Sequence, residues 1–233
     1  MKRFYREVAV AEAPGGWQVT LDGRGIRTAG GAAAQVVPSR ALAEALAQEW
    51  AVQGEEIDPA GFRLRDPADY AIDVIAPDPA AAISTLLGFA ETDTLCYRAD
   101  PDEPLHARQL AEWEPLLSQL EQREGVRFTR VSGIIHRPQP PATLAQLRAL
   151  LGTLDPFTLA GLHLATSLAA SLAIPLLALD EVAAPEALWD AANLEEEWQA
   201  ELWGRDLQAE ERRARRRADF LAACEWLRLV RAG

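Results

Sequence analysis

The residues whose types and spacing could do chemistry gather near the carboxyl end of the sequence, between Leu194 and Gly204. If this run is helical, Glu196, Gln199 and Trp203 fall on one stripe, at spacings of three and four residues. The stripe would present a carboxylate, an amide and an indole together. Tryptophan offers a large apolar area with one hydrogen-bond donor, and it is enriched at protein interfaces. The pattern is typical of a surface that binds another protein.

A purely structural interpretation of the same run is also open. Asn193 could cap the start of the helix, with Glu196 as its partner three positions into the helix. Trp203 could belong to the core. A neighbouring stripe is expected to be buried: Leu194, Trp198 and Leu202.

The catalytic patterns that sequence motifs reveal are absent. A phosphate-binding loop needs a lysine before Ser or Thr, and the only lysine in the chain is Lys2. There is no His-Glu-x-x-His helix and no Gly-x-Ser-x-Gly elbow. Cys96 and Cys224 have neither the number for a disulfide framework nor the spacing of a zinc site, and nothing supports Cys96 as a nucleophile. We therefore expect no metal and no cofactor.

One alternative function remains an enzyme that acts on a small molecule at a site between two domains. That site would use four polar residues in one short stretch: Glu91, Asp93, Tyr97 and Arg98. We expect these residues to form a structural network of hydrogen bonds and ion pairs instead. A third alternative is a general protein-interaction scaffold.

Charge excludes one class of partner and points to another. The 233 residues carry a formal net charge of −12, whereas proteins that bind nucleic acid present clustered Lys and Arg. Residues 180–211 hold eleven acidic groups and one basic group, and five arginines follow between 212 and 217. Such neighbouring blocks predict helices that pair with each other or with a charged partner.

The N-terminal residues lack the apolar region of a signal peptide, so we expect a cytoplasmic protein. Residues 157–174 contain no charge but are rich in small and polar residues. They are expected to form a buried helix, and we expect no stable insertion into a membrane.

The pattern of elements predicts an α+β fold, with a small β-rich domain over residues 1–60 and a larger, mostly helical domain over 61–233. Short alternating segments and the turn at Asp22-Gly23 predict antiparallel strands near the N-terminus. Ser39 is a good N-cap for a helix that contains Trp50. One helix is expected over 185–203. Residues 126–131 look like a strand that could pair with the N-terminal sheet.

Several longer motifs resemble a known family over nearly the whole chain. They are Lys2-Arg3-Phe4-Tyr5, Leu21-Asp22-Gly23-Arg24, Glu49-Trp50 with Gln53-Gly54-Glu55-Glu56-Ile57-Asp58-Pro59, Glu91-Thr92-Asp93-Thr94-Leu95-Cys96-Tyr97-Arg98 and Pro138-Gln139-Pro140-Pro141. The most specific is Glu196-x-Trp198-Gln199-x-x-x-Trp203-Gly204. On these residues the chain resembles the assembly chaperones of the F-type ATP synthase that act on the alpha subunit, in a bacterial form. Residues 64–70 depart from the family pattern, which puts any contact from that loop in doubt.

The resemblance implies a non-enzymatic protein that binds the unassembled alpha subunit and shields it from aggregation until it pairs with beta. It implies partner contacts at Glu196, Gln199, Trp203, Trp198 and Gly204. Trp50 is assigned instead to the core between helix and sheet. We expect the free protein to be a monomer.

Overall fold

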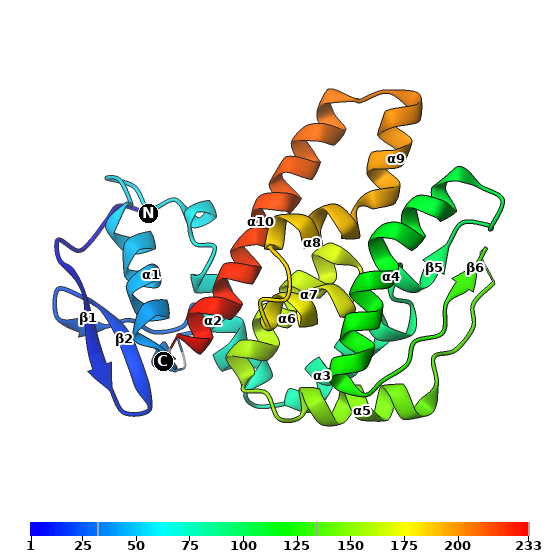
Figure 1. The fold of residues 1–233 in the computed structure, drawn as a ribbon. Coiled ribbons are helices and arrows are strands. Elements are labelled where there is room, and N and C mark those ends of the chain that lie inside the picture. The colour runs from blue at the N-terminus through cyan, green and yellow to red at the C-terminus, as the bar shows by residue number, and fades with distance from the viewer. Residues whose placement is uncertain (32, 134, 233) are drawn as a thin grey trace. The chain divides into compact units, whose positions relative to one another are not determined.

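The computed structural model describes residues 1–31, 33–133 and 135–232, and these residues divide into two units. The first unit contains residues 1–79, 155–161 and the end of the chain from Glu225 onward. The second unit contains residues 80–154 and 162–224. The N-terminal strands are followed by a helical region, which confirms the α+β prediction (Figure 1). The boundary expected after residue 60 stays a prediction.

The first unit is built on a small antiparallel sheet. Strands β1 (Val8–Ala13) and β2 (Gly16–Leu21) pair along their full lengths, and β3 (Arg24–Gly25) and β4 (Val36–Val37) both pair with β2. The turn between β2 and β3 has Asp22 at φ 50° and Gly23 at φ 77°. A two-residue hairpin of this kind needs two left-handed residues, and Asp-Gly adopts them readily.

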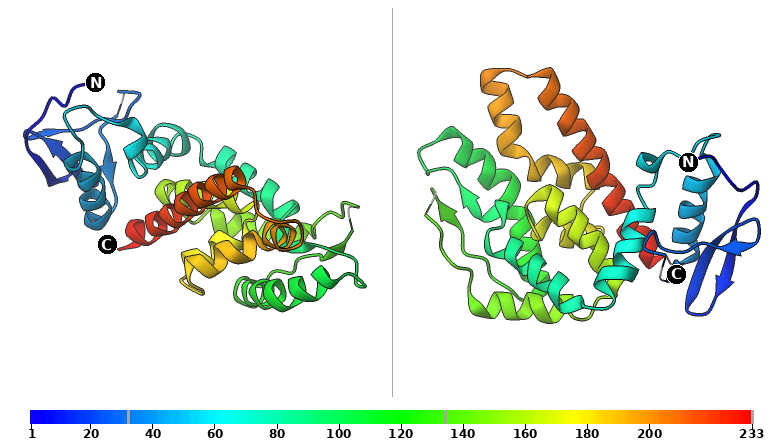
Figure 2. Two further views of the ribbon diagram at one scale, coloured as in Figure 1. Left: turned by 90° about the horizontal axis from the view of Figure 1, so that it is seen from above. Right: turned by 180° about the vertical axis from the view of Figure 1, so that it is seen from behind.

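Helix α1 (Arg40–Ala51) packs on this sheet, and the strands and the helix lie side by side in all views (Figures 1 and 2). The Ser39 hydroxyl accepts the N–H of Leu42 at 3.0 Å, so the predicted N-cap is confirmed. The buried face of α1 carries Leu42, Leu46 and Trp50 at spacings of four residues. The unit continues with a short 3-10 turn η1 (Pro59–Gly61), helix α2 (Arg65–Tyr70) and a π-helical turn η2 (Ala71–Ile75).

The second unit is helical. Its elements are α3 (Pro79–Glu91), the 3-10 turn η3 (Thr94–Cys96), α4 (Pro104–Glu124), α5 (Pro141–Leu151), α7 (Ala173–Leu179), α8 (Pro185–Ala192) and α9 (Leu194–Trp203). Helices α6 (Pro156–Ala169) and α10 (Leu207–Arg231) contribute residues to both units. The core is filled by bulky side chains that are fully buried, including Trp113, Trp189 and Phe220.

The segment from Val126 to Val131 does not pair with the N-terminal sheet. Its last residue begins the two-residue strand β6 (Val131–Ser132), which runs parallel to β5 (Tyr97–Arg98). Before Val131, side chains and not a neighbouring strand accept the backbone N–H groups of this segment. The N–H of Phe128 donates to Glu121 at 2.6 Å, and the N–H of Thr129 donates to Gln139 at 2.7 Å. Because these backbone groups are already satisfied, the segment needs no sheet, and the predicted pairing is wrong.

Candidate partner-binding surface

Helix α9 positions the residues that the sequence singled out, but it is shorter than expected. The helix predicted over 185–203 is interrupted at Asn193, between α8 and α9. The Asn193 side chain donates to the carbonyl of Trp189 at 2.9 Å and caps neither helix start. The predicted capping of α9 by Asn193 is therefore wrong, and Glu196 has no part in such a cap. The helix ends at Gly204, whose φ of 90° lets the chain turn and whose N–H donates to the carbonyl of Ala200.

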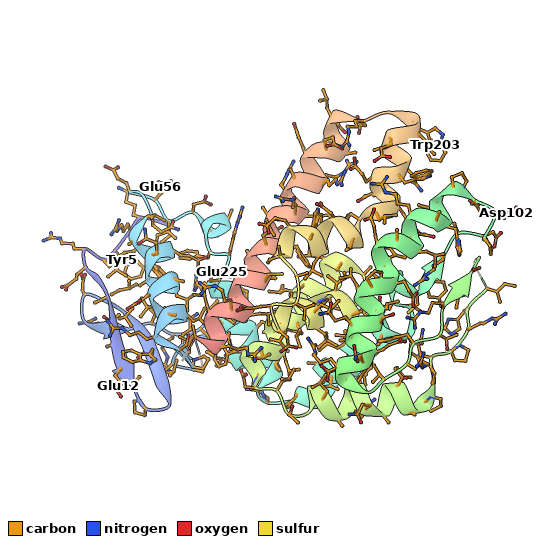
Figure 3. The ribbon with its side chains drawn as sticks, viewed as in Figure 1. Tyr5, Glu12, Glu56, Asp102, Trp203 and Glu225 are labelled. Atoms are coloured by element: carbon orange, nitrogen blue, oxygen red, sulfur yellow. The ribbon has the colours of Figure 1, made fainter. Side chains whose placement is uncertain are left out.

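The predicted stripe forms one wall of a cavity of about 210 Å³. Glu196, Gln199, Trp203 and Gly204 line it together, and the other wall comes from residues 205–213 at the start of α10. Trp203 lies at the end of α9 with 78% of its surface exposed (Figure 3). The structure therefore brings four of the five proposed contact residues to one place.

Trp198, the fifth residue, lies elsewhere on α9. It is half-buried, and the guanidinium of Arg108 lies 5.8 Å from the centre of its ring. Arg108 also pairs with Glu201 at 2.9 Å. Of the stripe expected to be buried, Leu194 is buried, but more than half of Leu202 is exposed, so that prediction is wrong for Leu202.

Two exposed leucines that the sequence analysis did not assign to the surface adjoin Trp203 in the chain. Leu207 has 83% of its surface exposed, and Leu202 is exposed as well. Three large apolar side chains within six residues are an unusual concentration for an exposed surface, and such concentrations mark interaction sites. The sequence feature that could have revealed them is the turn at residues 204–206. A leucine lies on each side of this turn, where the core does not cover it.

Ion pairs between glutamates and arginines border this surface. Glu197 is held by Arg205 and Arg213, and the hydrogen bond from Arg213 is the main reason why the pKa of its carboxyl lies below the usual range. Glu196 approaches Arg216 at 3.7 Å but keeps more than half of its side chain exposed. Within the acidic block, Glu196, Glu197 and Glu211 thus pair with arginines of the following basic block, in line with the predicted pairing. Glu196 lines the cavity together with Glu210, which pairs with Arg205.

The four residues of the alternative catalytic cluster lie in the second unit and are distant in sequence from the end of α9. Asp93 is fully buried, and its carboxylate accepts the N–H groups of Leu95, Leu172 and Ala173 at 2.8–3.1 Å. It thereby satisfies donors at the start of α7, where the N-cap residue Leu172 offers no side-chain acceptor and Ser171 accepts the N–H of Ile174. Burial, the main cause, raises the pKa of Asp93 to about 6.

The remaining members of the cluster also have partners or lie apart. Arg98 is buried and pairs with Glu114 at 2.7 Å, and the Tyr97 hydroxyl lies 2.8 Å from His136 Nδ1. Glu91 is the last residue of α3. The contacts of Arg98 and Tyr97 are those expected of a structural network, and the structural role of the four residues stays a prediction.

The cysteines offer no nucleophile. Cys96 and Cys224 are free and buried, and burial raises the pKa of each thiol, that of Cys224 to about 12. Neutral thiols neither attack substrates nor bind metals. Across residues 1–31, 33–133 and 135–232, no three His, Cys, Asp or Glu side chains gather as a metal site would require.

Trp50 lies on α1 in the first unit, where it is buried against the N-terminal segment at Tyr5 and the loop at Phe62. The hydroxyl of Tyr5 donates to its carbonyl at 2.7 Å, and its ring contacts those of Tyr5 and Phe62 at centroid distances of 5.5 and 4.6 Å. This is the environment of a core anchor.

Within the part of the chain that the structure describes, no single helix has both the length and the apolar composition to cross a membrane. Two consecutive helical segments, Arg65–Ile75 and Pro79–Cys96, meet these criteria only when they are taken together.

Comparisons with known proteins agree on one family. Residues 2–121 match the model of the family described as ATP12 chaperone protein. The crystal structure of Atp12 from Paracoccus denitrificans is 36% identical, with a TM-score of 0.93, over 99% of this chain and 98% of that one. A structure of a point mutant of the same protein matches equally.

Two further relatives extend the comparison. A crystal structure from Agrobacterium tumefaciens is 40% identical, with a TM-score of 0.92, over 97% of this chain and 85% of that one. The mitochondrial protein atp12 of Schizosaccharomyces pombe is 25% identical over 214 residues, which are 87% of this chain and 74% of that protein. The sequence resemblance, the matched family model and the near-complete structural overlap lead to one conclusion: the chain belongs to the ATP12 chaperone family, as a bacterial member of these ATP synthase assembly chaperones.

Proposed function

We propose that this assembly chaperone binds the unassembled alpha subunit of the F-type ATP synthase through the end of α9 and the start of α10. It would cover the alpha surface that beta later occupies and so prevent aggregation until the two subunits pair. In this proposal the chaperone works as a monomer in the cytoplasm, and it catalyses no reaction.

The observation that carries the proposal is an exposed indole beside an available carboxylate. Trp203 and its neighbouring leucines provide apolar area at the centre of the surface, while Glu196 and the paired charges around it provide a polar rim. An apolar centre with a polar rim is the anatomy of protein interfaces that form and separate again. Buried tryptophans also carry much of the binding energy in such interfaces.

Gln199 lies between these two groups on the helix and lines the same cavity. Its amide can donate to and accept from a partner backbone, which would fix the orientation of the contact. Gly204 keeps the end of the helix free of a side chain beside Trp203. We assign Trp198 a supporting part, because Arg108 covers its ring.

The proposal is tested by charge reversal of Glu196. In Glu196→Lys, an ammonium replaces the available carboxylate, and capture of purified alpha subunit should fall at least about tenfold because a charge at the contact is reversed. Binding is measured by interferometry with immobilised chaperone. Glu211→Lys is the matched control, because Glu211 is an exposed carboxylate on α10 that does not line the cavity. It should bind normally.

The same experiment separates the alternatives. If Glu196→Lys melts like the parent protein and still captures alpha, the assignment of the surface is wrong. If the parent protein does not bind alpha but retains other polypeptides from the same preparation, the scaffold alternative replaces it. Turnover of a small metabolite by the parent protein would support the enzyme alternative.

A further inference from the structure

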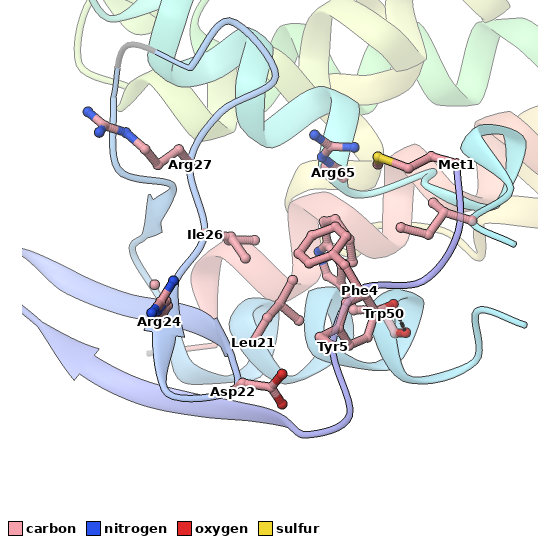
Figure 4. A pocket seen from close by; sticks show the side chains of 12 residues that line it. Met1, Phe4, Tyr5, Leu21, Asp22, Arg24, Ile26, Arg27, Trp50 and Arg65 are labelled. Carbon is pink, nitrogen blue, oxygen red and sulfur yellow. Dashed lines mark hydrogen bonds between the residues drawn. The ribbon is translucent and has the colours of Figure 1, made fainter. Parts of the chain in front are cut away.

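A second cavity lies within the first unit, and the proposed alpha-binding surface does not include it. Its volume is about 530 Å³, and its walls come from the N-terminal segment, β2, β3, α1 and α2 (Figure 4). Aromatic and aliphatic side chains line much of it, among them Tyr5, Leu21, Ile26 and Trp50. Binding pockets for organic ligands span about 300–1,000 Å³, and an apolar cavity of about 150 Å³ already holds benzene. This cavity therefore has room for more than one apolar side chain.

Two donors at this cavity lack an acceptor. Trp50 is 5% exposed, yet its indole Nε1 makes no hydrogen bond, and the same is true of the buried Nε of Arg65. Arg65 Nε lies 3.8 Å from the Asp69 carboxylate, too far for a hydrogen bond. Buried N–H groups are almost always paired in native proteins, because an unpaired one is unfavourable. Neither nitrogen has surface open to the cavity, so a ligand must be recognised by the other groups that line it.

The charges around the cavity indicate the sign of that ligand. Arg24, Arg27 and Arg65 line it, whereas Asp22 is the one carboxylate among its lining residues. Asp22 is occupied by the chain itself, since its Oδ1 accepts the N–H groups of Arg6 and Glu7 at 3.0 and 2.8 Å. A cationic cavity in a chain of net charge −12 is selective for an anionic ligand.

We propose that this cavity binds a short peptide segment that carries apolar side chains next to a carboxylate. The apolar side chains would lie against Tyr5, Ile26 and Trp50, and the carboxylate would accept hydrogen bonds from the guanidinium groups of the lining arginines. Phe4 and Met1 are exposed and also line the cavity, so a bound peptide would make apolar contacts with these residues as well as with the buried side chains. Peptide is the natural ligand for a chaperone, and the proposal does not depend on which subunit α9 binds.

Calorimetric titration of the whole chain with two synthetic peptides tests this. The first is acetyl-Leu-Phe-Asp-Leu-amide, whose only charge is the Asp side chain, and the second has Asn in place of Asp. The Asp peptide should bind about tenfold more tightly than the Asn peptide. It should also shift the indole N–H resonance of Trp50 in the NMR spectrum. Equal affinities, or an unmoved Trp50 resonance, would overturn the proposal.

Variants locate the site and separate it from the surface on α9. Arg24→Gln changes an exposed side chain and should weaken the Asp peptide several-fold, while Arg40→Gln, in the same unit but outside the cavity, should not. Glu196→Lys should bind the peptide like the parent protein, so failure of the alpha proposal leaves this test intact. If 3-phenylpropionate binds as tightly as the peptide, the cavity takes small free carboxylates and the peptide assignment is wrong.

Discussion

Asp93 carries a buried charge that joins two parts of the second unit. One oxygen accepts from Leu95 in η3 and the other from Leu172 and Ala173 at the start of α7. An amide could offer only one of these two acceptors and would turn an NH₂ group towards a donor. We expect Asp93→Asn to lower the free energy of unfolding by about 2–4 kcal/mol, because a buried hydrogen-bonded group loses its partner. Urea denaturation measures this, and an unchanged midpoint would contradict it.

The pH dependence of stability carries a second signature of the same residue. Its pKa is about 6 in the folded protein against an ordinary value of 3.8, so the folded state holds this proton more tightly. Between pH 3.8 and 6 the folded state binds more protons at Asp93, and its contribution to stability falls as pH rises. Two pKa units correspond to about 3 kcal/mol.

Other carboxyls titrate in the same range, so the quantity to measure is the difference between parent protein and Asp93→Asn. The stability advantage of the parent protein should shrink as pH rises from 4 to 6.5. A difference that does not vary over this range would mean that Asp93 titrates normally.

At the scale of the element, the packing of α1 against the N-terminal segment and the loop at Phe62 depends on Trp50. Its ring lies between Tyr5 and Phe62, and Arg65 already stacks over it at 5.2 Å. Trp50→Arg would place a second guanidinium there without a carboxylate partner. We expect a loss of several kcal/mol, as for an unpaired buried charge. Thermal unfolding measures it, with Trp17→Arg as a control, since Trp17 is only half-buried on β2. Equal melting temperatures for parent and Trp50→Arg would refute the core assignment.

The elements that the sequence predicted correctly are those that local chemistry decides. Ser39 caps α1 and Asp22-Gly23 turns the hairpin because each acts on its own backbone neighbourhood. The break at Asn193 could not be predicted in this way, because an N-cap residue and a helix-ending residue look alike in sequence. Likewise, Phe128 escapes a strand only because Glu121, on another element, accepts its N–H.

The same distinction between local and long-range determinants applies to the two candidate sites. The stripe of Glu196, Gln199 and Trp203 follows from helical periodicity alone, and in the structure the three residues line one cavity, which the sequence did not predict. The cavity at Trp50 was not predicted, because it is assembled from the N-terminus, a hairpin and two helices. Sequence identifies Trp50 as apolar and bulky, but it cannot reveal that the indole N–H is left without an acceptor.

For the molecule as a whole, the balance of charge determines how encounter with a partner depends on salt. The acidic residues near α9 are largely paired with arginines, whereas the net charge of −12 belongs to the entire chain. Long-range attraction to a basic partner therefore reflects the whole charge, and it is screened when the Debye length falls from about 10 Å at 0.1 M salt to about 3 Å at 1 M. The contacts proposed for Trp203 would be apolar and would resist screening.

If the chaperone captures alpha as proposed, salt should act on the association rate and leave the dissociation rate nearly unchanged. We expect the association rate constant to fall about tenfold between 0.1 and 1 M NaCl. Trp203→Ala should show the opposite behaviour, with faster dissociation and the same dependence of association on salt. Both are measured by stopped-flow mixing with labelled alpha subunit. An association rate that is insensitive to salt would mean that the acidity of the chain has no part in capture.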